Sequence, residues 1–223
     1  MARVTPALAP LVLLAACAGH GARPTGIVEQ APPIIELTGW RAVATLPDQQ
    51  RLTLLPSLWP RAVAAVPRRA QPRLKAEGAL VDPTGALELP APPPGPYYCR
   101  LLRFGGRAGL RSFKPDICYV EGDSARLSFT KQTGESRPGG WLYPDGPKRL
   151  VFLGATPPPG SRAVPLYGKH PAQDVTGLVE RVSPFRWRMT LARAGAGAVM
   201  DVYELVPVPP EVPGAMPAAP AKS

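Results

Sequence analysis

The sequence predicts an α+β protein, in which a short N-terminal helical segment packs beside an antiparallel β-meander or a small β-barrel of about seven strands. Apolar residues recur at helical spacing only in the first part of the chain, whereas from residue 97 onward they alternate with polar residues. Proline and glycine, at 32 and 22 of 223 residues, exclude a compact all-helical bundle. Hydrophobic residues make up 45% of the chain, so we expect one core and a single folded domain over residues 38–206.

Residues 1–16 have the features of an export signal. Arg3 supplies a positive charge, and the apolar stretch that ends at Ala16 is too short to cross a bilayer, which needs about 20 residues. The run Leu14-Ala15-Ala16-Cys17 resembles the bacterial lipobox. We therefore expect cleavage between Ala16 and Cys17 and attachment of lipid to the Cys17 thiol. An ordinary secretory signal with an incidental Cys17 is the alternative.

The two flanks of the folded domain lack a hydrophobic period. Residues 17–37 are small, polar or proline-containing and are expected to form a flexible tether. Ala18 follows the cysteine, and by resemblance to lipoprotein sorting this favours a lipid-anchored protein at the periplasmic face of the bacterial outer membrane. Residues 207–223 contain six prolines and no large apolar cluster, so we expect a disordered tail.

Residues 38–78 are predicted to be helical. Thr45-Leu46-Pro47-Asp48 is typical of a helix start, with threonine as cap, proline in the first turn and an acid at the third position. Pro56 and Pro60 interrupt the apolar stripe that follows, and an interior proline costs about 3 kcal/mol. We therefore expect a kinked helix or several short helices, followed by a proline-rich connection over residues 79–96.

Residues 97–206 are predicted to be antiparallel β-structure. Phe185, Trp187 and Met189 alternate with polar residues and are expected to share one buried face of a strand. Turn signals such as Pro144-Asp145-Gly146-Pro147 separate the apolar runs at hairpin spacing. Short strands in this number indicate a meander that curls strongly or closes into a small barrel.

Cys99 and Cys118 remain as an even pair once Cys17 carries lipid. In an oxidising compartment such a pair predicts a disulfide, which would contribute about 3 kcal/mol by closing a loop of roughly 20 residues. Two free buried thiols are the alternative. His20 and His170 do not supply ligand spacing with these cysteines, so we expect no metal site.

The segment between Cys99 and Cys118 contains a cluster of cations with no acidic residue before Asp116. They are Arg100, Arg103, Arg107, Arg111 and Lys114. Such a cluster is a candidate anion-binding loop, and in an exported protein the anion is an envelope lipid or polymer and not nucleic acid. A solvated loop in an arginine-rich chain of net charge +10 is the alternative.

No catalytic constellation is recognisable. Gly122-Asp123-Ser124 superficially resembles the nucleophile block of GDS-type hydrolases but lacks the downstream Asp-x-x-His. The glycine-rich run 105–109 lacks the Lys-Ser/Thr of a phosphate-binding loop. Glu180, Asp201 and Glu204 are expected to pair with arginines. The sequence therefore predicts no catalytic residue and no cofactor, and it disfavours an enzyme.

Several short motifs occur in an order that resembles a known family. They are Trp40-Arg41, Pro47-Asp48, Tyr98-Cys99-Arg100, Phe129-Thr130-Lys131, Gly134 with Arg137-Pro138, Leu142-Tyr143-Pro144-Asp145, Arg149-Leu150-Val151-Phe152-Leu153-Gly154, and Glu180-Arg181 followed by Arg186-Trp187-Arg188. On these motifs, residues 40–207 resemble the domain of unknown function 4893 family of bacterial exported lipoproteins. The resemblance implies no activity.

Together these features predict a non-catalytic, lipid-anchored envelope protein that acts by binding. Its expected partners are the membrane, through the lipid anchor, and an anionic envelope lipid or polymer, or an envelope protein. A small-barrel carrier of an apolar ligand is one alternative, provided that Phe129, Phe152, Trp187 and Met189 leave the interior open. An inhibitor of an envelope enzyme is the other.

Overall fold

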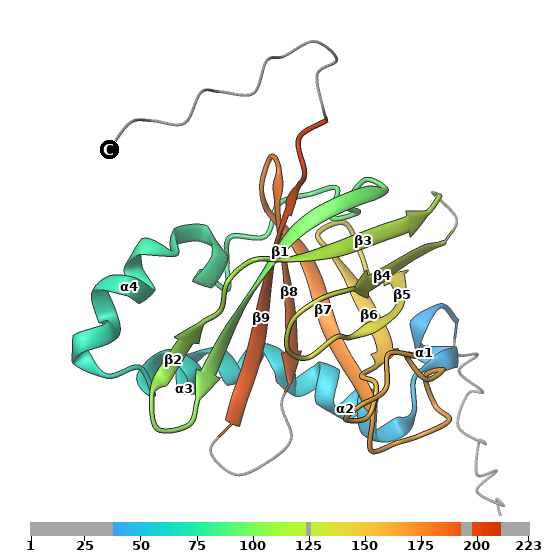
Figure 1. Ribbon diagram of the computed structural model, residues 1–223, viewed down its shortest axis with the longest axis horizontal. Helices are drawn as coiled ribbons and strands as arrows, with labels where there is room; N and C mark the ends of the chain where they lie inside the picture. Colours follow the sequence, from blue (N-terminus) through green and yellow to red (C-terminus); the bar gives the residue numbers. More distant parts are fainter. Residues whose placement is uncertain (1–37, 124–125, 193–197, 211–223) are drawn as a thin grey trace, which may run out of the picture. The chain divides into compact units, whose positions relative to one another are not determined.

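A computed structural model describes residues 38–123, 126–192 and 198–210, which form a helical segment followed by an antiparallel β-barrel (Figure 1). The predicted signal, the Ala16–Cys17 cleavage site, the tether and residues 211–223 of the tail lie outside these ranges. None of the helices in the described ranges is both long and apolar enough to cross a membrane.

The helical segment is a series of short helices. They are α1 (Trp40–Val43), α2 (Leu46–Leu54), η1 (Leu55–Ser57), α3 (Leu58–Ala64), η2 (Arg68–Ala70), α4 (Gln71–Ala76) and η3 (Gly78–Val81). The hydroxyl of Thr45 caps α2 by accepting a hydrogen bond from the Asp48 amide at 3.3 Å. Pro56 lies in η1 and Pro60 in the first turn of α3, so the prolines divide the segment into short helices.

Eight strands close into the barrel, and the described residues contain a ninth strand attached to it. The strands are β1 (Gly95–Gly105), β2 (Gly109–Ser112), β3 (Asp116–Gly122), β4 (Leu127–Lys131), β5 (Gly139–Pro144), β6 (Arg149–Ala155), β7 (Asp174–Ser183), β8 (Arg186–Ala192) and β9 (Ala198–Pro207). Neighbours are antiparallel, and pairing of β1 with β9 closes the barrel. The predicted fold class is confirmed, with eight strands plus one where about seven were expected.

The interior of the barrel is filled with side chains. Phe129 and Phe152 meet edge to face with their ring centroids 6.0 Å apart, and Trp187 and Met189 are buried beside them. Phe185, which was expected on the same buried face, instead lies in the turn after β7 and is exposed. That prediction was wrong because β8 begins one residue later, at Arg186, and Phe185 lies in the turn beyond the end of the barrel.

The helical segment covers part of the outside of the barrel. Trp40, Leu52 and Leu55 pack on Val151 and Leu153 of β6. Further along the segment, another apolar cluster joins the helices to β1 and β9: its members include Trp59, Leu74, Leu80, Leu102, Phe104 and Val202. Strand β6 is therefore buried on both faces, which explains its nearly continuous apolar run, and in β1 the helices cover Leu102 and Phe104 on the outer face.

Arg188 of β8 joins the barrel wall to the end of the helical segment. Its side chain is fully buried, and its Nε and Nη2 donate to Glu180 Oε2 of β7 at 2.9 and 2.6 Å. Its Nη1 donates to the carbonyl oxygens of Leu80 and Asp82 at 3.3 and 2.6 Å, and its guanidinium lies 5.1 Å from the Trp59 ring centroid. The charge is thus paired, and its donors are occupied on both sides of the interface.

The proline-rich connection closes one end of the barrel. The indole Nε1 of Trp187 donates to the Pro90 carbonyl at 3.0 Å, and the Tyr97 hydroxyl donates to the Pro93 carbonyl at 2.6 Å. Burial raises the pKa of Tyr97 to about 12, because the phenolate is poorly solvated there. Side-chain donors from inside the barrel therefore hold this proline-rich cap in place.

The predicted disulfide between Cys99 and Cys118 is confirmed, with a Cα–Cα distance of 5.9 Å. It joins β1 to β3 at the point where β1 changes its partner along one edge. Cys99 pairs with Asp116 in the last β1–β3 step, and Leu102 pairs with Ser112 in the first β1–β2 step. The bridge therefore holds the branch at which β2 leaves the barrel.

Replacement of both bridged cysteines, Cys99→Ser with Cys118→Ser, should lower the free energy of unfolding by about 3 kcal/mol, since the unfolded chain regains the freedom of a closed loop. Denaturant titration of the oxidised proteins measures the loss. Wild-type protein treated with reductant is the control and should lose a similar amount, whereas the variant should not respond to reductant. Equal stability of oxidised wild type and variant would contradict the expectation.

Candidate functional site

The five cations of the predicted anion-binding loop separate into two groups. Arg100 and Arg103 lie on β1 and point to opposite faces, as an odd spacing on a strand requires. Arg100 donates to Glu204 at 2.6 Å and to Glu77 at 2.5 and 2.8 Å, and these hydrogen bonds, with that to Glu77 foremost, raise its pKa. Both arginines belong to internal ion pairs and are not available to a ligand.

Arg103 lies on the inner side of β1, at the open end of the barrel. Its Nε and Nη2 bind the two carboxylate oxygens of Asp201 at 2.9 and 3.0 Å, and Nη2 also donates to Ser136 Oγ at 3.0 Å. The hydrogen bond to Asp201 is the main cause of the raised pKa of Arg103. Its role is to hold the strand ends and the β4–β5 loop together.

The other three cations of the predicted loop, Arg107, Arg111 and Lys114, are exposed. Within the described residues none of them lies within 4.0 Å of a carboxylate. The Arg111 guanidinium stacks 4.6 Å from the Phe113 ring centroid, which leaves its edge open to solvent. The structure therefore leaves these three as candidates for binding an anion.

The helical segment brings further cations to the same end of the molecule. A side chain at Gly109, in the hairpin between β1 and β2, would collide with Ala65 and Pro67, so this hairpin packs tightly on the loop before η2. Exposed cations then lie on both sides of this contact. We call the following set the cationic end: Arg68, Arg69, Arg73, Lys75, Arg107 and Arg111.

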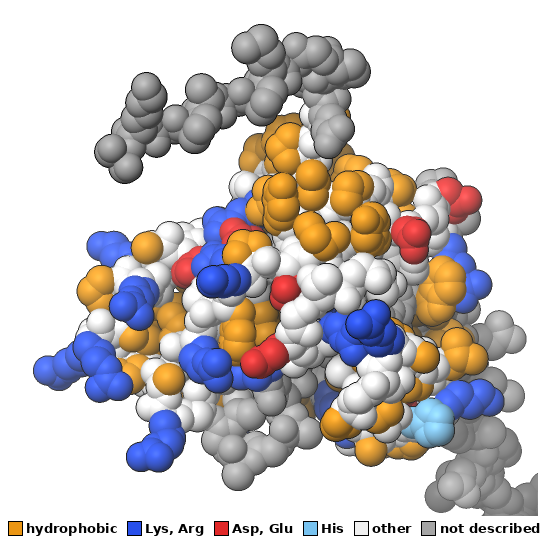
Figure 2. Space-filling view, viewed as in Figure 1, with side chains coloured by type: hydrophobic (Ala, Val, Ile, Leu, Met, Phe, Trp, Pro, Cys, Tyr) orange, Lys and Arg blue, Asp and Glu red, His pale blue; other side chains and the backbone are white. Residues whose placement is uncertain are grey.

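A groove of about 470 Å³ runs between α4 and β2 through the cationic end. Arg73 and Arg111 line it from the two sides, together with apolar atoms of Leu110. Glu77 is the acid among its lining residues, but Arg100 already binds the Glu77 carboxylate. Figure 2 shows the blue side chains of this region over α4 and the β1–β2 hairpin.

The sequence prediction missed the contribution of the helical segment. Arg68, Arg69, Arg73 and Lys75 are about 30 residues from the predicted loop, and only the packing at Gly109 unites the two groups. A signal was present, because no acidic residue occurs between Asp48 and Glu77. Arg68, Arg69, Arg73 and Lys75 therefore have no acidic residue nearby in the sequence except Glu77, which binds Arg100.

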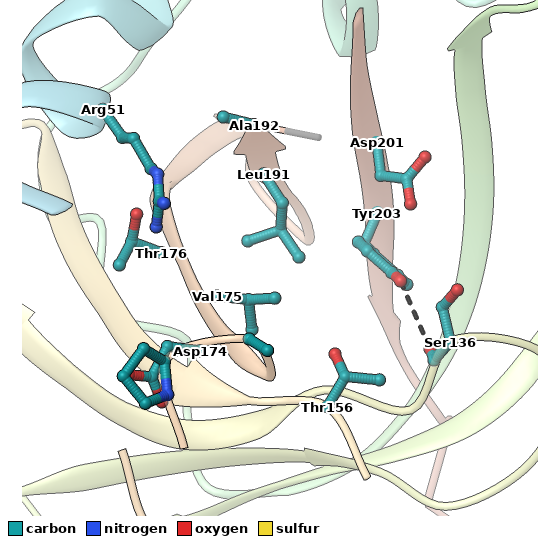
Figure 3. Close-up of a pocket in the computed structure, with 12 residues that line it drawn as sticks. Arg51, Ser136, Thr156, Asp174, Val175, Thr176, Leu191, Ala192, Asp201 and Tyr203 are labelled. Carbon is teal, nitrogen blue, oxygen red and sulfur yellow. Dashed lines mark hydrogen bonds between the residues drawn. The ribbon is translucent and has the colours of Figure 1, made fainter. Parts of the chain in front are cut away.

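A second hollow, of about 410 Å³, lies at the open end of the barrel (Figure 3). Arg51 points into it but also donates to Asp48 at 2.6 Å. The Tyr203 hydroxyl donates to the Ser136 carbonyl at 3.2 Å. Asp174 accepts from the Gly168 amide at 3.1 and 3.2 Å, and burial raises its pKa.

The acidic residues that were expected to pair with arginines form such ion pairs. Glu180 binds Arg188, and Glu204 binds both Arg100 and Arg186. In the described ranges, no group of three or more His, Cys, Asp or Glu residues is arranged to hold a metal ion. Among the surfaces described, the cationic end is the one whose exposed cations lack ion pairs within the described residues.

The comparisons with known proteins give a family. A family model with the description domain of unknown function (DUF4893) matches residues 40–205. The chain belongs to this family. No curated protein matches the chain. The matched part of this DUF4893 protein runs from α1 to β9, so the helical segment and the barrel together make up the family's domain.

The two groups of cations should respond differently to substitution. Arg100→Gln should lower the free energy of unfolding by about 2 kcal/mol, because Glu77 loses its main partner in a partly buried place. The triple variant Arg107→Gln, Arg111→Gln and Lys114→Gln should stay within about 0.5 kcal/mol of wild type, as is usual for exposed sites. Denaturant titration compares the three proteins, and an equal loss in both variants would refute the division.

Proposed function

We propose that this protein is a non-catalytic, lipid-anchored component of the bacterial envelope that binds an anionic envelope polymer or lipid through its cationic end. One observation carries the proposal: two segments distant in sequence place six exposed cations together, and within the described residues these cations lack ion pairs. The net charge of +10 favours encounter with such a partner.

The arrangement suits a surface that carries many phosphates or carboxylates. Arginine presents a planar fork that can bind two oxygens of one phosphate, and Arg73 and Arg111 line opposite walls of one groove. Each basic residue near an anionic membrane surface contributes about 1 kcal/mol, and salt weakens the attraction. Several such contacts on a fixed frame give useful affinity although each one is weak.

The membrane anchor is supported by the sequence at the N-terminus. The positive Arg3, the short apolar run and the lipobox-like Leu14-Ala15-Ala16-Cys17 predict export and attachment of lipid at Cys17. The filled interior gives no support to a carrier of an apolar ligand, since Phe129, Phe152 and Met189 occupy that space. Binding at the surface is the function that remains best supported.

The anchor can be tested in bacteria that express the full chain. Cys17→Ser should abolish incorporation of labelled palmitate, because it removes the proposed acylation site, and the protein should leave the membrane fraction or stall before cleavage. Lipid labelling followed by fractionation gives the result. Label that persists in Cys17→Ser would rule out this anchor.

The cationic end can be tested with a soluble form that begins after Cys17. This protein should bind vesicles of phosphatidylglycerol and phosphatidylcholine in low salt, and the pair of changes Arg73→Gln and Arg107→Gln should weaken that binding about tenfold or more, given about 1 kcal/mol per charge. Co-sedimentation at several lipid concentrations measures the partition coefficient.

A matched variant controls for the change in net charge. Arg162 and Lys169 are exposed and lie outside the cationic end, so Arg162→Gln with Lys169→Gln removes the same charge from another part of the surface. This control should retain most of the binding. An equal loss in both variants would mean that net charge, and not the cationic end, determines the affinity.

A further inference from the structure

The end of the barrel that the proline-rich cap closes carries exposed apolar side chains. Leu89 and Phe185 are each 75% exposed, although they come from segments almost 100 residues apart. Both line one hollow of about 380 Å³, whose other walls include Pro93, Pro94 and Pro207. Figure 2 shows a dense group of hydrophobic side chains at the end of the molecule where β9 ends.

Hydrogen bonds hold the segment that carries Leu89 in place. The Leu87 amide donates to the Arg181 carbonyl at 2.8 Å, and the Arg181 guanidinium donates to the Glu88 carbonyl at 2.6 and 3.0 Å. The Leu89 amide donates to the Pro147 carbonyl at 3.1 Å. Leu89 has a φ of 57°, an uncommon backbone conformation for leucine, and its side chain is held outward and gains no burial in the core.

The hollow between Leu89 and Phe185 is lined largely by prolines, with Arg181 as its charged member. The prolines of the cap have no N–H to donate. Two of the cap carbonyls, those of Pro90 and Pro93, already accept hydrogen bonds from Trp187 and Tyr97. The desolvation of the proline-lined part therefore costs little, and this part tolerates an apolar environment better than an ordinary loop does.

We propose that this apolar end docks on a lipid bilayer, with Leu89 and Phe185 inserted among the lipid chains at the headgroup boundary. Two protruding side chains on turns suit a deformable medium, whereas a rigid protein partner would need matching pockets. Lys148 is exposed next to Pro147, which holds Leu89, and it can reach headgroup phosphates.

The inference rests on the proposed function only for the presence of a bilayer nearby. The sequence predicts a flexible tether over residues 17–37, which lie outside the described residues; a flexible chain of about 20 residues has a root-mean-square span of about 25 Å and would keep an anchored domain close to the membrane. Docking through the apolar end itself needs no anchor and no anionic lipid. It is therefore separable from the Cys17 anchor and from the cationic end.

The test uses the soluble form, vesicles of pure phosphatidylcholine and 0.5 M salt, which shortens the screening length to a few ångströms and suppresses binding through the cationic end. Wild type should float with the vesicles, and Leu89→Ser with Phe185→Ser should lower its partition coefficient at least tenfold, or about 1.4 kcal/mol. Leu54→Ser with Leu166→Ser is the matched control, since these leucines are 60% and 71% exposed elsewhere. The control should float as wild type does.

A second measurement tests whether the side chain at position 185 enters the bilayer. Phe185→Trp should show tryptophan fluorescence that brominated acyl chains quench more than they quench the wild type. Failure of wild type to float, equal flotation of the Leu89/Phe185 variant, or absence of extra quenching would overturn the docking proposal. A wild-type dimer in sedimentation that the same variant dissociates would assign the patch to a second copy of the chain. Loss of anionic-vesicle binding in the Arg73/Arg107 variant tests the proposed function separately.

Discussion

The arrangement of this molecule depends on the buried charge of Arg188. A guanidinium without water needs a counter-ion and acceptors for its donors, and here Glu180 of β7 supplies the charge while the chain around η3 supplies two carbonyls. Removal of any of these partners would leave a buried polar group unpaired, which costs several kcal/mol. The end of the helical segment therefore has one favourable position on the barrel wall.

The position of the groove follows from that of η3. Glu77 directly precedes η3, and its carboxylate reaches Arg100 of β1 and lies 3.9 Å from Arg186 of β8. Glu204 of β9 joins the same two arginines. The outer wall thus carries an alternating ladder of arginine and glutamate from β7 to β1, which aligns α4 with the β1–β2 hairpin. Glu77, Glu180 and Glu204 all form ion pairs in this ladder. They do not neutralise the exposed cations of the cationic end.

The local features of the fold were predictable from the sequence, and the long-range ones were not. Alternation identified the strand around Trp187, and the Thr45 cap marked the start of α2, because both signals act over a few residues. The sequence did not decide between an open meander and a closed barrel, since the closing strands β1 and β9 are about 100 residues apart. Leu101 and Leu102 are both buried because the helices cover the outer face, an arrangement that the period of a single strand does not reveal.

The candidate site, too, was predictable from the sequence only in its local features. The two cysteines gave the disulfide through their even number and the expected compartment, whereas the fate of each cation depended on partners elsewhere in the chain. Arg100 meets Glu77 and Arg103 meets Asp201, 23 and 98 residues away. No spacing rule separates these two arginines from Arg107. Only the register of β1 with β9 and the location of Glu77 do so.

The packed middle of the barrel makes it a rigid support between its two ends. Strand β1 has 11 residues, begins beside the proline-rich cap and leads to the hairpin that carries Arg107. Eleven residues at about 3.3 Å each, tilted by about 40°, give a height of about 28 Å. With the apolar end on a bilayer, this support would hold an anionic partner at a set height above the lipid, so the barrel would act as a spacer whose length its strands determine.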